Sequence, residues 1–141
     1  MSLMTAIEVG ASGLTAQRRR LEVLVSNLVN ANTTQPAGTE PYRRKDVLFT
    51  ATSPETSFGM ALEDAVQGVE VSKVVTDMSD PIKRYEPNHP HADKDGYVSY
   101  PNVNAMEEMT NVLSATRSYE ANLQAVNMVK EMQQKTLEIL R

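Results

Sequence analysis

All seven prolines of this 141-residue chain fall between residues 36 and 101. A proline inside a helix removes a backbone hydrogen bond and clashes with the preceding turn. The two ends of the chain are therefore free to form long helices, whereas the middle favours loops, turns and short strands. This distribution predicts three parts: an N-terminal helix in residues 1–34, an insert in residues 35–101 and a C-terminal helix in residues 102–141.

The N-terminal end repeats apolar residues every seven positions. The repeat consists of Ile7, Leu14, Leu21 and Leu28. Such a heptad predicts a helix over residues 3–31, roughly 40 Å long, with a coiled-coil-like apolar seam. Gly10 and Gly13 lie near the seam, where they either weaken the helix locally or let a neighbouring helix approach closely.

The C-terminal end predicts a second, longer helix. Asn104 followed three residues later by Glu107 has the form of an N-terminal capping box. No proline or glycine follows, so the helix runs to the end of the chain over roughly 55 Å. Its apolar stripe reads Met106, Met109, Leu113, Tyr119, Leu123, Val126, Val129, Met132, Leu137 and Leu140.

The insert has a different character. Residues 32–68 are rich in Thr, Pro, Gly and Ala and are expected to be mostly loop, with a possible short helix at 59–66. The β-branched run at 69–76 predicts a strand, followed by a turn at 79–81 and strands at 82–86 and 97–100. The predicted fold is mainly α: two terminal helices paired as a coiled-coil-like hairpin, with a small irregular or β-hairpin insert between them.

Composition excludes several kinds of chemistry. The absence of cysteine rules out disulfides, thiolate-bound metals and thiol catalysis. The net charge is −4, and the basic runs at 18–20 and 43–45 are not interleaved with stacking aromatic residues, so we expect no nucleic acid. No nucleophile elbow, phosphate loop or dinucleotide fingerprint occurs. We therefore expect neither an enzyme nor a cofactor.

One cluster has metal-capable spacing. His89, His91 and Asp93 bring two imidazoles and a carboxylate into five residues. Nothing in a proline-flanked loop holds these side chains in register, so we favour a solvated turn and expect no metal. A metal-dependent enzyme built on the three residues is the alternative.

Targeting signals are also missing. The first residues carry no basic start and no apolar run of signal-peptide length, and no stretch is long enough to span a membrane. On these criteria alone the chain is cytosolic, provided that no unusual export route operates.

The helices are too long for the small insert to cover, which indicates self-association or association with similar helices. Asn27 and Asn30 lie among the apolar residues of the first helix, and buried amides at such positions fix register and partner choice at a cost in stability. The predicted assembly interface consists of Ile7, Leu14, Leu21, Leu24, Asn27, Leu28, Asn30, Met109, Leu113, Tyr119, Leu123, Val126, Leu137 and Leu140.

These segments resemble a known family. Residues 11–17 (ASGLTAQ), 21–23 and 26–34 (SNLVNANTT) are similar to the N-terminal signature of bacterial flagellar rod, hook and hook-associated proteins. Further segments resemble the proximal-rod branch of that family: residues 41–47, 68–71, 89–93, 96–98, 101–104, 107–109 and 115–122. Val29 stands where the family commonly has Ala, and residues 51–67 match no pattern.

The resemblance implies a structural subunit of the flagellar basal-body rod. Such proteins leave the cell unfolded through the flagellar export channel, without a cleaved signal, and polymerise in the periplasm, so the resemblance replaces the cytosolic expectation. Implied partners are copies of the chain, other rod proteins and the membrane ring or export-gate adaptor. Each subunit would bury its heptad seam against its own Leu113, Leu123, Val126 and Leu137 and against neighbours. The alternative is a helical-hairpin adaptor of a related secretion apparatus.

Overall fold

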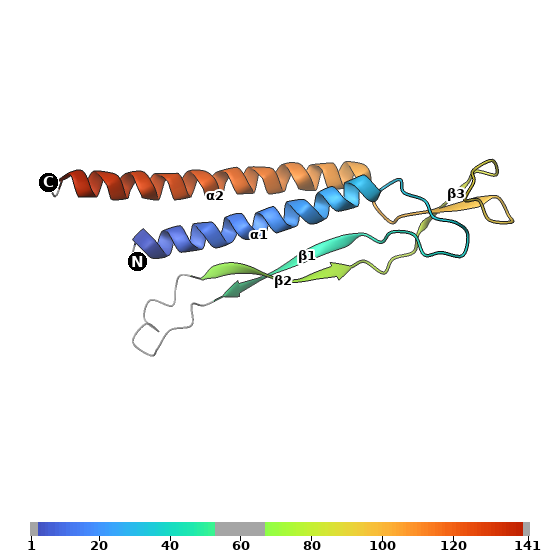
Figure 1. Cartoon of the computed structure of the whole chain (residues 1–141), viewed down its shortest axis with the longest axis horizontal. Helices are drawn as coiled ribbons and strands as arrows, with labels where there is room; N and C mark the ends of the chain where they lie inside the picture. The colour runs from blue at the N-terminus through green and yellow to red at the C-terminus, as the bar shows by residue number, and fades with distance from the viewer. Residues whose placement is uncertain (1–2, 53–66, 140–141) are drawn as a thin grey trace.

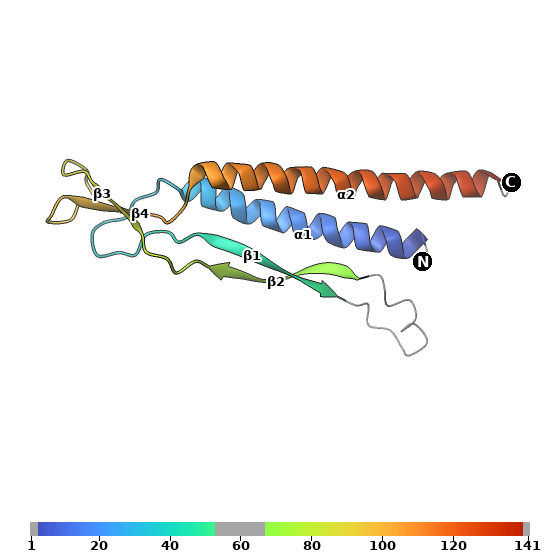
Figure 2. The ribbon, with the colours of Figure 1, turned by 180° about the vertical axis from the view of Figure 1, so that it is seen from behind.

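The computed structural model describes residues 3–52 and 67–139 of the chain. Along the chain the elements are α1 (Leu3–Asn30), β1 (Lys45–Thr52), β2 (Gly68–Thr76), β3 (Ile82–Tyr85), β4 (Tyr97–Tyr100) and α2 (Ala105–Ile139). The two helices lie side by side and antiparallel, and the β1–β2 hairpin runs along the other side of α1 (Figure 1). The β3–β4 hairpin lies beyond one end of the helix pair, which gives an elongated molecule (Figure 2). The predicted arrangement of two terminal helices around a small β-containing insert is confirmed.

Helix α1 begins and ends within one residue of its predicted range. Its buried residues are Ala16, Val23, Leu24 and Asn27. The heptad residues Ile7, Leu14, Leu21 and Leu28 are only half-buried. Within the single chain, these four residues are thus less exposed to solvent than the heptad residues.

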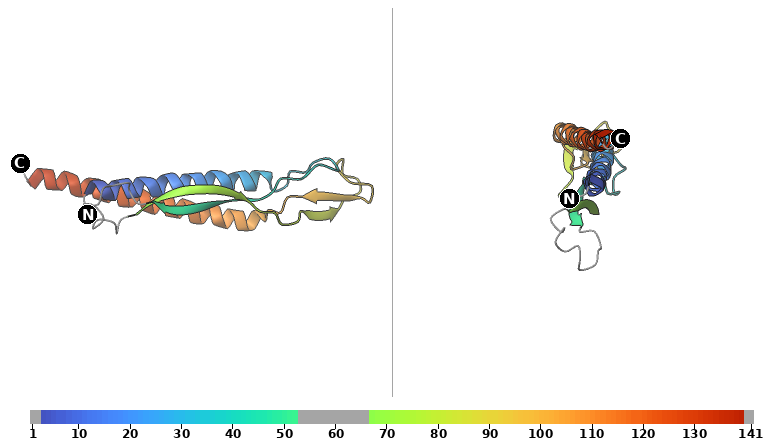
Figure 3. Two further views of the ribbon diagram at one scale, coloured as in Figure 1. Left: turned by 90° about the horizontal axis from the view of Figure 1, so that it is seen from below. Right: turned by 90° about the vertical axis from the view of Figure 1, so that its left-hand side faces the viewer.

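Helix α2 begins where the sequence predicts. The Asn104 side-chain oxygen accepts a hydrogen bond from the Met106 N–H at 3.1 Å, and its carbonyl accepts from the Glu108 N–H at 2.9 Å. This contact satisfies a backbone donor that the first turn of a helix leaves free. At its other end α2 extends past the start of α1, and the side chains of residues 131–138 are all exposed (Figure 3).

The apolar stripe predicted on α2 mixes two faces of the helix. Glu108, Ala115 and Val126 are buried, and Val126 is the only one of these three in the predicted stripe. Leu113, Leu123 and Leu137 remain 62%, 42% and 63% exposed, so the expectation that the chain buries them against its own α1 is wrong. The predicted stripe was chosen by hydrophobicity alone. It therefore omitted Glu108 and Ala115, the polar and the small residue that α2 buries.

The strands at 69–76, 82–86 and 97–100 are confirmed within one residue at each end. They form two separate antiparallel pairs, β1 with β2 and β3 with β4. Strand β1 was not predicted: residues 45–52 were expected to be loop. The run from Val47 to Thr50 carries β-forming residues, but Val47, Leu48 and Phe49 are apolar in succession and so lack the alternation that identifies a strand. The register shifts between Leu48 and Phe49, where β2 carries one extra residue. The possible helix at 59–66 lies outside the described residues.

No described helix is long and apolar enough to cross a membrane.

Candidate functional site: the helix pair and its polar junction

The two helices approach closely where α1 carries glycine. A side-chain carbon added at Gly10 would stand 2.5 Å from Cγ2 of Val126, and one added at Gly13 would stand 2.9 Å from Nδ2 of Asn122. On α2, seven residues before Asn122, Ala115 is 0% exposed. The glycines predicted to allow close approach therefore face α2 of the same chain.

Asn27 makes a polar junction between α1, the insert and α2. Its Nδ2 donates to the Lys45 carbonyl at 2.7 Å and to Oε2 of Glu108 at 3.1 Å. Its Oδ1 accepts from the Lys45 N–H at 3.0 Å and from the Tyr42 hydroxyl at 2.9 Å. Asn27 and Glu108 are each 0% exposed, and they are the buried polar residues of the described chain. The predicted burial of Asn27 thus needs no neighbouring subunit.

Arg44 completes the junction from the insert. Its Nε donates to Oε1 of Glu108 at 2.7 Å, and the carboxylate side chain is 1% exposed. This hydrogen bond, opposed by burial and aided by the charge of Glu108, raises the pKa of Arg44 above its ordinary value. The Arg44 N–H donates to Oδ1 of Asn102 at 2.8 Å. We call Asn27, Arg44 and Glu108 the polar junction.

Sequence reasoning missed two members of the polar junction. Arg44 was considered only within a basic run weighed for nucleic-acid contact, and Glu108 only within the segment 107–109 that carries the family resemblance. Asn27 was singled out, but its partners lie 18 and 81 positions away, at Lys45 and Glu108. No local pattern connects residues so distant in sequence. Asn30, the other predicted amide, is half-buried and donates to the Ser26 carbonyl of its own helix at 2.8 Å.

The predicted interface residues divide by exposure. Leu24, Asn27 and Val126 are buried within the chain. Those left half-buried are Ile7, Leu14, Leu21, Leu28, Asn30 and Tyr119. Those left exposed are Met109, Leu113, Leu123 and Leu137. Leu140 lies outside the described residues.

Several large apolar side chains near the polar junction are open to water. On α2, Met106 is 74%, Met109 49% and Leu113 62% exposed; on α1, Val25 is 46% and Val29 72% exposed. Because Asn27 of α1 stands opposite Glu108 of α2, both groups lie at the same level along the helix pair. We call these five residues the end patch. Apolar side chains at i, i+3 and i+7 of a helix are typical of a surface that binds another helix.

His89, His91 and Asp93 make hydrogen bonds in and around the turn between β3 and β4. Nδ1 of His89 accepts from the His91 N–H at 3.1 Å, and Nδ1 of His91 lies 2.8 Å from the Thr34 hydroxyl. Oδ1 of Asp93 accepts from the Asp95 and Tyr97 N–H groups. Within residues 3–52 and 67–139 no group of three or more His, Cys, Asp or Glu side chains is placed to hold a metal ion. The three residues thus serve the turn between β3 and β4.

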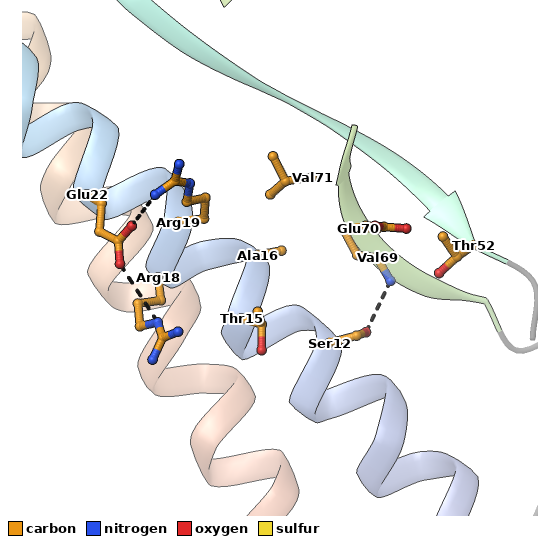
Figure 4. A pocket seen from close by; sticks show the side chains of 10 residues that line it. All are labelled: Ser12, Thr15, Ala16, Arg18, Arg19, Glu22, Thr52, Val69, Glu70 and Val71. Carbon is orange, nitrogen blue, oxygen red and sulfur yellow. Dashed lines mark hydrogen bonds and ion pairs between the residues drawn. The ribbon is translucent and has the colours of Figure 1, made fainter. Parts of the chain in front are cut away.

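A groove of about 640 Å³ separates α1 from β2 (Figure 4). The Ser12 hydroxyl accepts from the Val69 N–H at 3.1 Å and so joins the helix to the strand. Arg18 and Arg19 both pair with Glu22, at 3.9 and 2.8 Å. Two arginines of the basic run are thus engaged with one acidic residue, which leaves no flat cationic face there.

Comparison with known proteins matches both helices. A family described as "Flagella basal body rod protein" matches residues 7–36, and one described as "Flagellar basal body rod FlgEFG protein C-terminal" matches residues 94–139. The flagellar basal-body rod protein FlgC of Salmonella typhimurium is 40% identical over 97% of each chain. That of Bacillus subtilis is 43% identical over 99% of each, and that of Borreliella burgdorferi is 39% identical over 100% of this chain and 99% of its own.

The chain belongs to the FlgC-type flagellar basal-body rod proteins. The predicted resemblance is confirmed, and the role is that of a structural rod subunit in the flagellar basal body. Membership of this structural family implies a non-enzymatic role. In this FlgC-type chain the matched regions cover most of α1, β4 and α2, and so contain Asn27 and Glu108 of the polar junction but not Arg44.

Proposed function

We propose that this rod subunit polymerises through its terminal helices into the helical drive shaft around the export channel. The helices form a coiled-coil-like inner layer, residues 1–34 and 102–141, and the insert, residues 35–101, packs outside. The observation that carries the proposal is the end patch, five large apolar side chains that the chain leaves open to water. Large apolar side chains left open to water on two neighbouring helices mark surfaces for protein association.

The C-terminal part of α2 also supports assembly through the terminal helices. Met132 and Leu137 are 57% and 63% exposed in the C-terminal part of α2, whose end extends past the start of α1 (Figure 1). A subunit with open apolar surface at both ends of its helix pair is suited to head-to-tail contacts. Such contacts generate an open helix when the rotation between subunits does not close a ring. The half-buried heptad residues of α1 complete the surfaces that neighbours would cover.

The partners follow from this assembly. They are copies of the chain, other rod proteins and, at the base, the membrane ring or export-gate adaptor. We infer export without a cleaved signal through the flagellar channel and folding in the periplasm. The absence of cysteine suits this route, because a chain threaded unfolded into an oxidising compartment has no thiol to mispair.

The alternative of an adaptor in a related secretion apparatus has less support. An adaptor would share the helical periodicity, but three relatives from distant bacteria carry the rod name and align over nearly the whole of both chains.

A substitution on the exposed face tests the proposal. In a flagellated host lacking its own FlgC, Leu113→Asp should be exported but absent from isolated basal bodies, because the carboxylate would be buried against a neighbour. Its high exposure predicts unchanged helical content in the free subunit. Leu21→Asp and Leu123→Asp should act in the same direction.

Ser114→Asp is the matched control, since it places the same charge one residue further along an exposed part of α2. We expect this variant to enter the rod. Normal motility and normal rod content with Leu113→Asp would refute assembly through this face.

A further inference from the structure

The seam between α1 and α2 pairs Gly10 with Val126 and Gly13 with Asn122. Gly13 lies opposite Asn122, and the residues seven positions to either side of Asn122 are Ala115 and Val129. A shift of one heptad, about 10 Å, would place Ala115 or Val129 opposite Gly13, and Tyr119 or Gln133 opposite Gly10.

The polar junction accepts only one register. With α2 shifted by seven residues one way, Asn27 would face Ala115 and Glu108 would lie beyond the last turn of α1. Shifted the other way, Asn27 would face Pro101, before α2 begins. Either shift separates Asn27 from Glu108, and leaving a buried amide or carboxylate without its partners is costly.

The polar junction also ties the insert to this register. Both backbone groups of Lys45 bond Asn27 of α1, while the neighbouring Arg44 bonds Glu108 of α2. Strand β1 begins at Lys45, so its first residues touch both helices at one point. A shift of either helix would break the contact with the insert as well.

We infer that the polar junction sets the axial register of the helix pair and the height of the insert along it. Buried polar groups are known to fix register at a cost in stability. In the rod, whose assembly is the proposed function, this register determines how far α2 overhangs α1. It therefore determines where the next subunit docks. The inference itself concerns the free chain and stands apart from assembly.

Engineered cysteine pairs can read the register, because the natural chain has none. The pair Gly13→Cys/Asn122→Cys reports the observed register, and Gly13→Cys/Ala115→Cys and Gly13→Cys/Val129→Cys report the two shifted ones. Each pair is placed in the natural background and in Asn27→Leu/Arg44→Met/Glu108→Leu. The readout is the fraction of intramolecular disulfide at redox equilibrium in dilute solution, measured by mass spectrometry of the full chain.

We expect the 13–122 disulfide to dominate at least about tenfold in the natural background and at most about threefold in the apolar one. Apolar replacement of a whole buried polar cluster is often tolerated, so helical content should persist. A preference that stays above tenfold in the apolar background would overturn the inference. Loss of helical content in that background would overturn it too, because the seam alone would then not hold the helices together.

Leu24→Ala is the control for instability alone. Leu24 is buried beside the polar junction and makes none of its hydrogen bonds, so this variant should be less stable yet keep the 13–122 preference. Equal loss of preference in Leu24→Ala would show that general weakening, not the polar junction, releases the register.

Discussion

Glu108 and Arg44 form a charge pair whose two members differ in exposure. The Glu108 side chain is 1% exposed and the Arg44 side chain 21%. A charge left without its partner costs most where water cannot reach it. If the carboxylate is removed, the guanidinium can turn partly towards solvent. If the guanidinium is removed, the carboxylate stays buried without its charged partner.

This asymmetry predicts unequal mutational effects. Arg44→Met should lower the free energy of unfolding by about 3–5 kcal/mol, the range for breaking a buried pair. Glu108→Leu should cost less, about 2 kcal/mol, because it removes the buried charge itself. Urea unfolding of the free subunit measures both, with Lys45→Met as control, since Lys45 contributes only backbone groups to Asn27. A larger loss for Glu108→Leu than for Arg44→Met would contradict this account of the pair.

The helix pair shows a similar contrast between two glycines. At Gly10 an added side-chain carbon meets the β-branched Val126, which has little freedom to move away. At Gly13 it meets the end of the Asn122 side chain, which can rotate away. Replacing glycine by alanine inside a helix otherwise stabilises by about 1 kcal/mol.

Gly10→Ala should therefore destabilise the subunit by about 1 kcal/mol, since overpacking costs about 1–3 kcal/mol and exceeds the gain in helix propensity. Gly13→Ala should be neutral or stabilising by up to about 1 kcal/mol. Thermal unfolding followed by circular dichroism compares the two variants directly. Equal effects would mean that the approach of α1 to α2 at Val126 is looser than the structure indicates.

Prediction from the sequence succeeded where the signal was local. Proline placement and heptad spacing located both helices, and Asn104 marked the start of α2. The pairing of strands and the polar junction depend on residues far apart in sequence, so no window around Glu108 or Arg44 could find them. The stripe on α2 was misassigned because Met106 and Leu113 are as apolar as core residues yet face away from α1.

The elongated molecule has only a small hydrophobic core within the single chain. Several large apolar side chains of α1 and α2 are exposed, whereas the buried apolar residues of the described chain are all Ala or Val apart from Leu24. A chain that buries so few large side chains gains much of its apolar burial only when neighbours cover these faces. The free subunit should accordingly be only marginally stable.

Methionine oxidation footprinting tests this burial at named positions. Met106 on α2 and Met78 in the insert are each 74% exposed in the chain, so peroxide should oxidise them at similar rates in the free subunit. In isolated basal bodies we predict strong protection of Met106, because a neighbouring helix covers the end patch, while Met78 stays reactive on the outer segment. Oxidation of Met106 at the same rate in rods as in the free subunit would contradict assembly through the terminal helices.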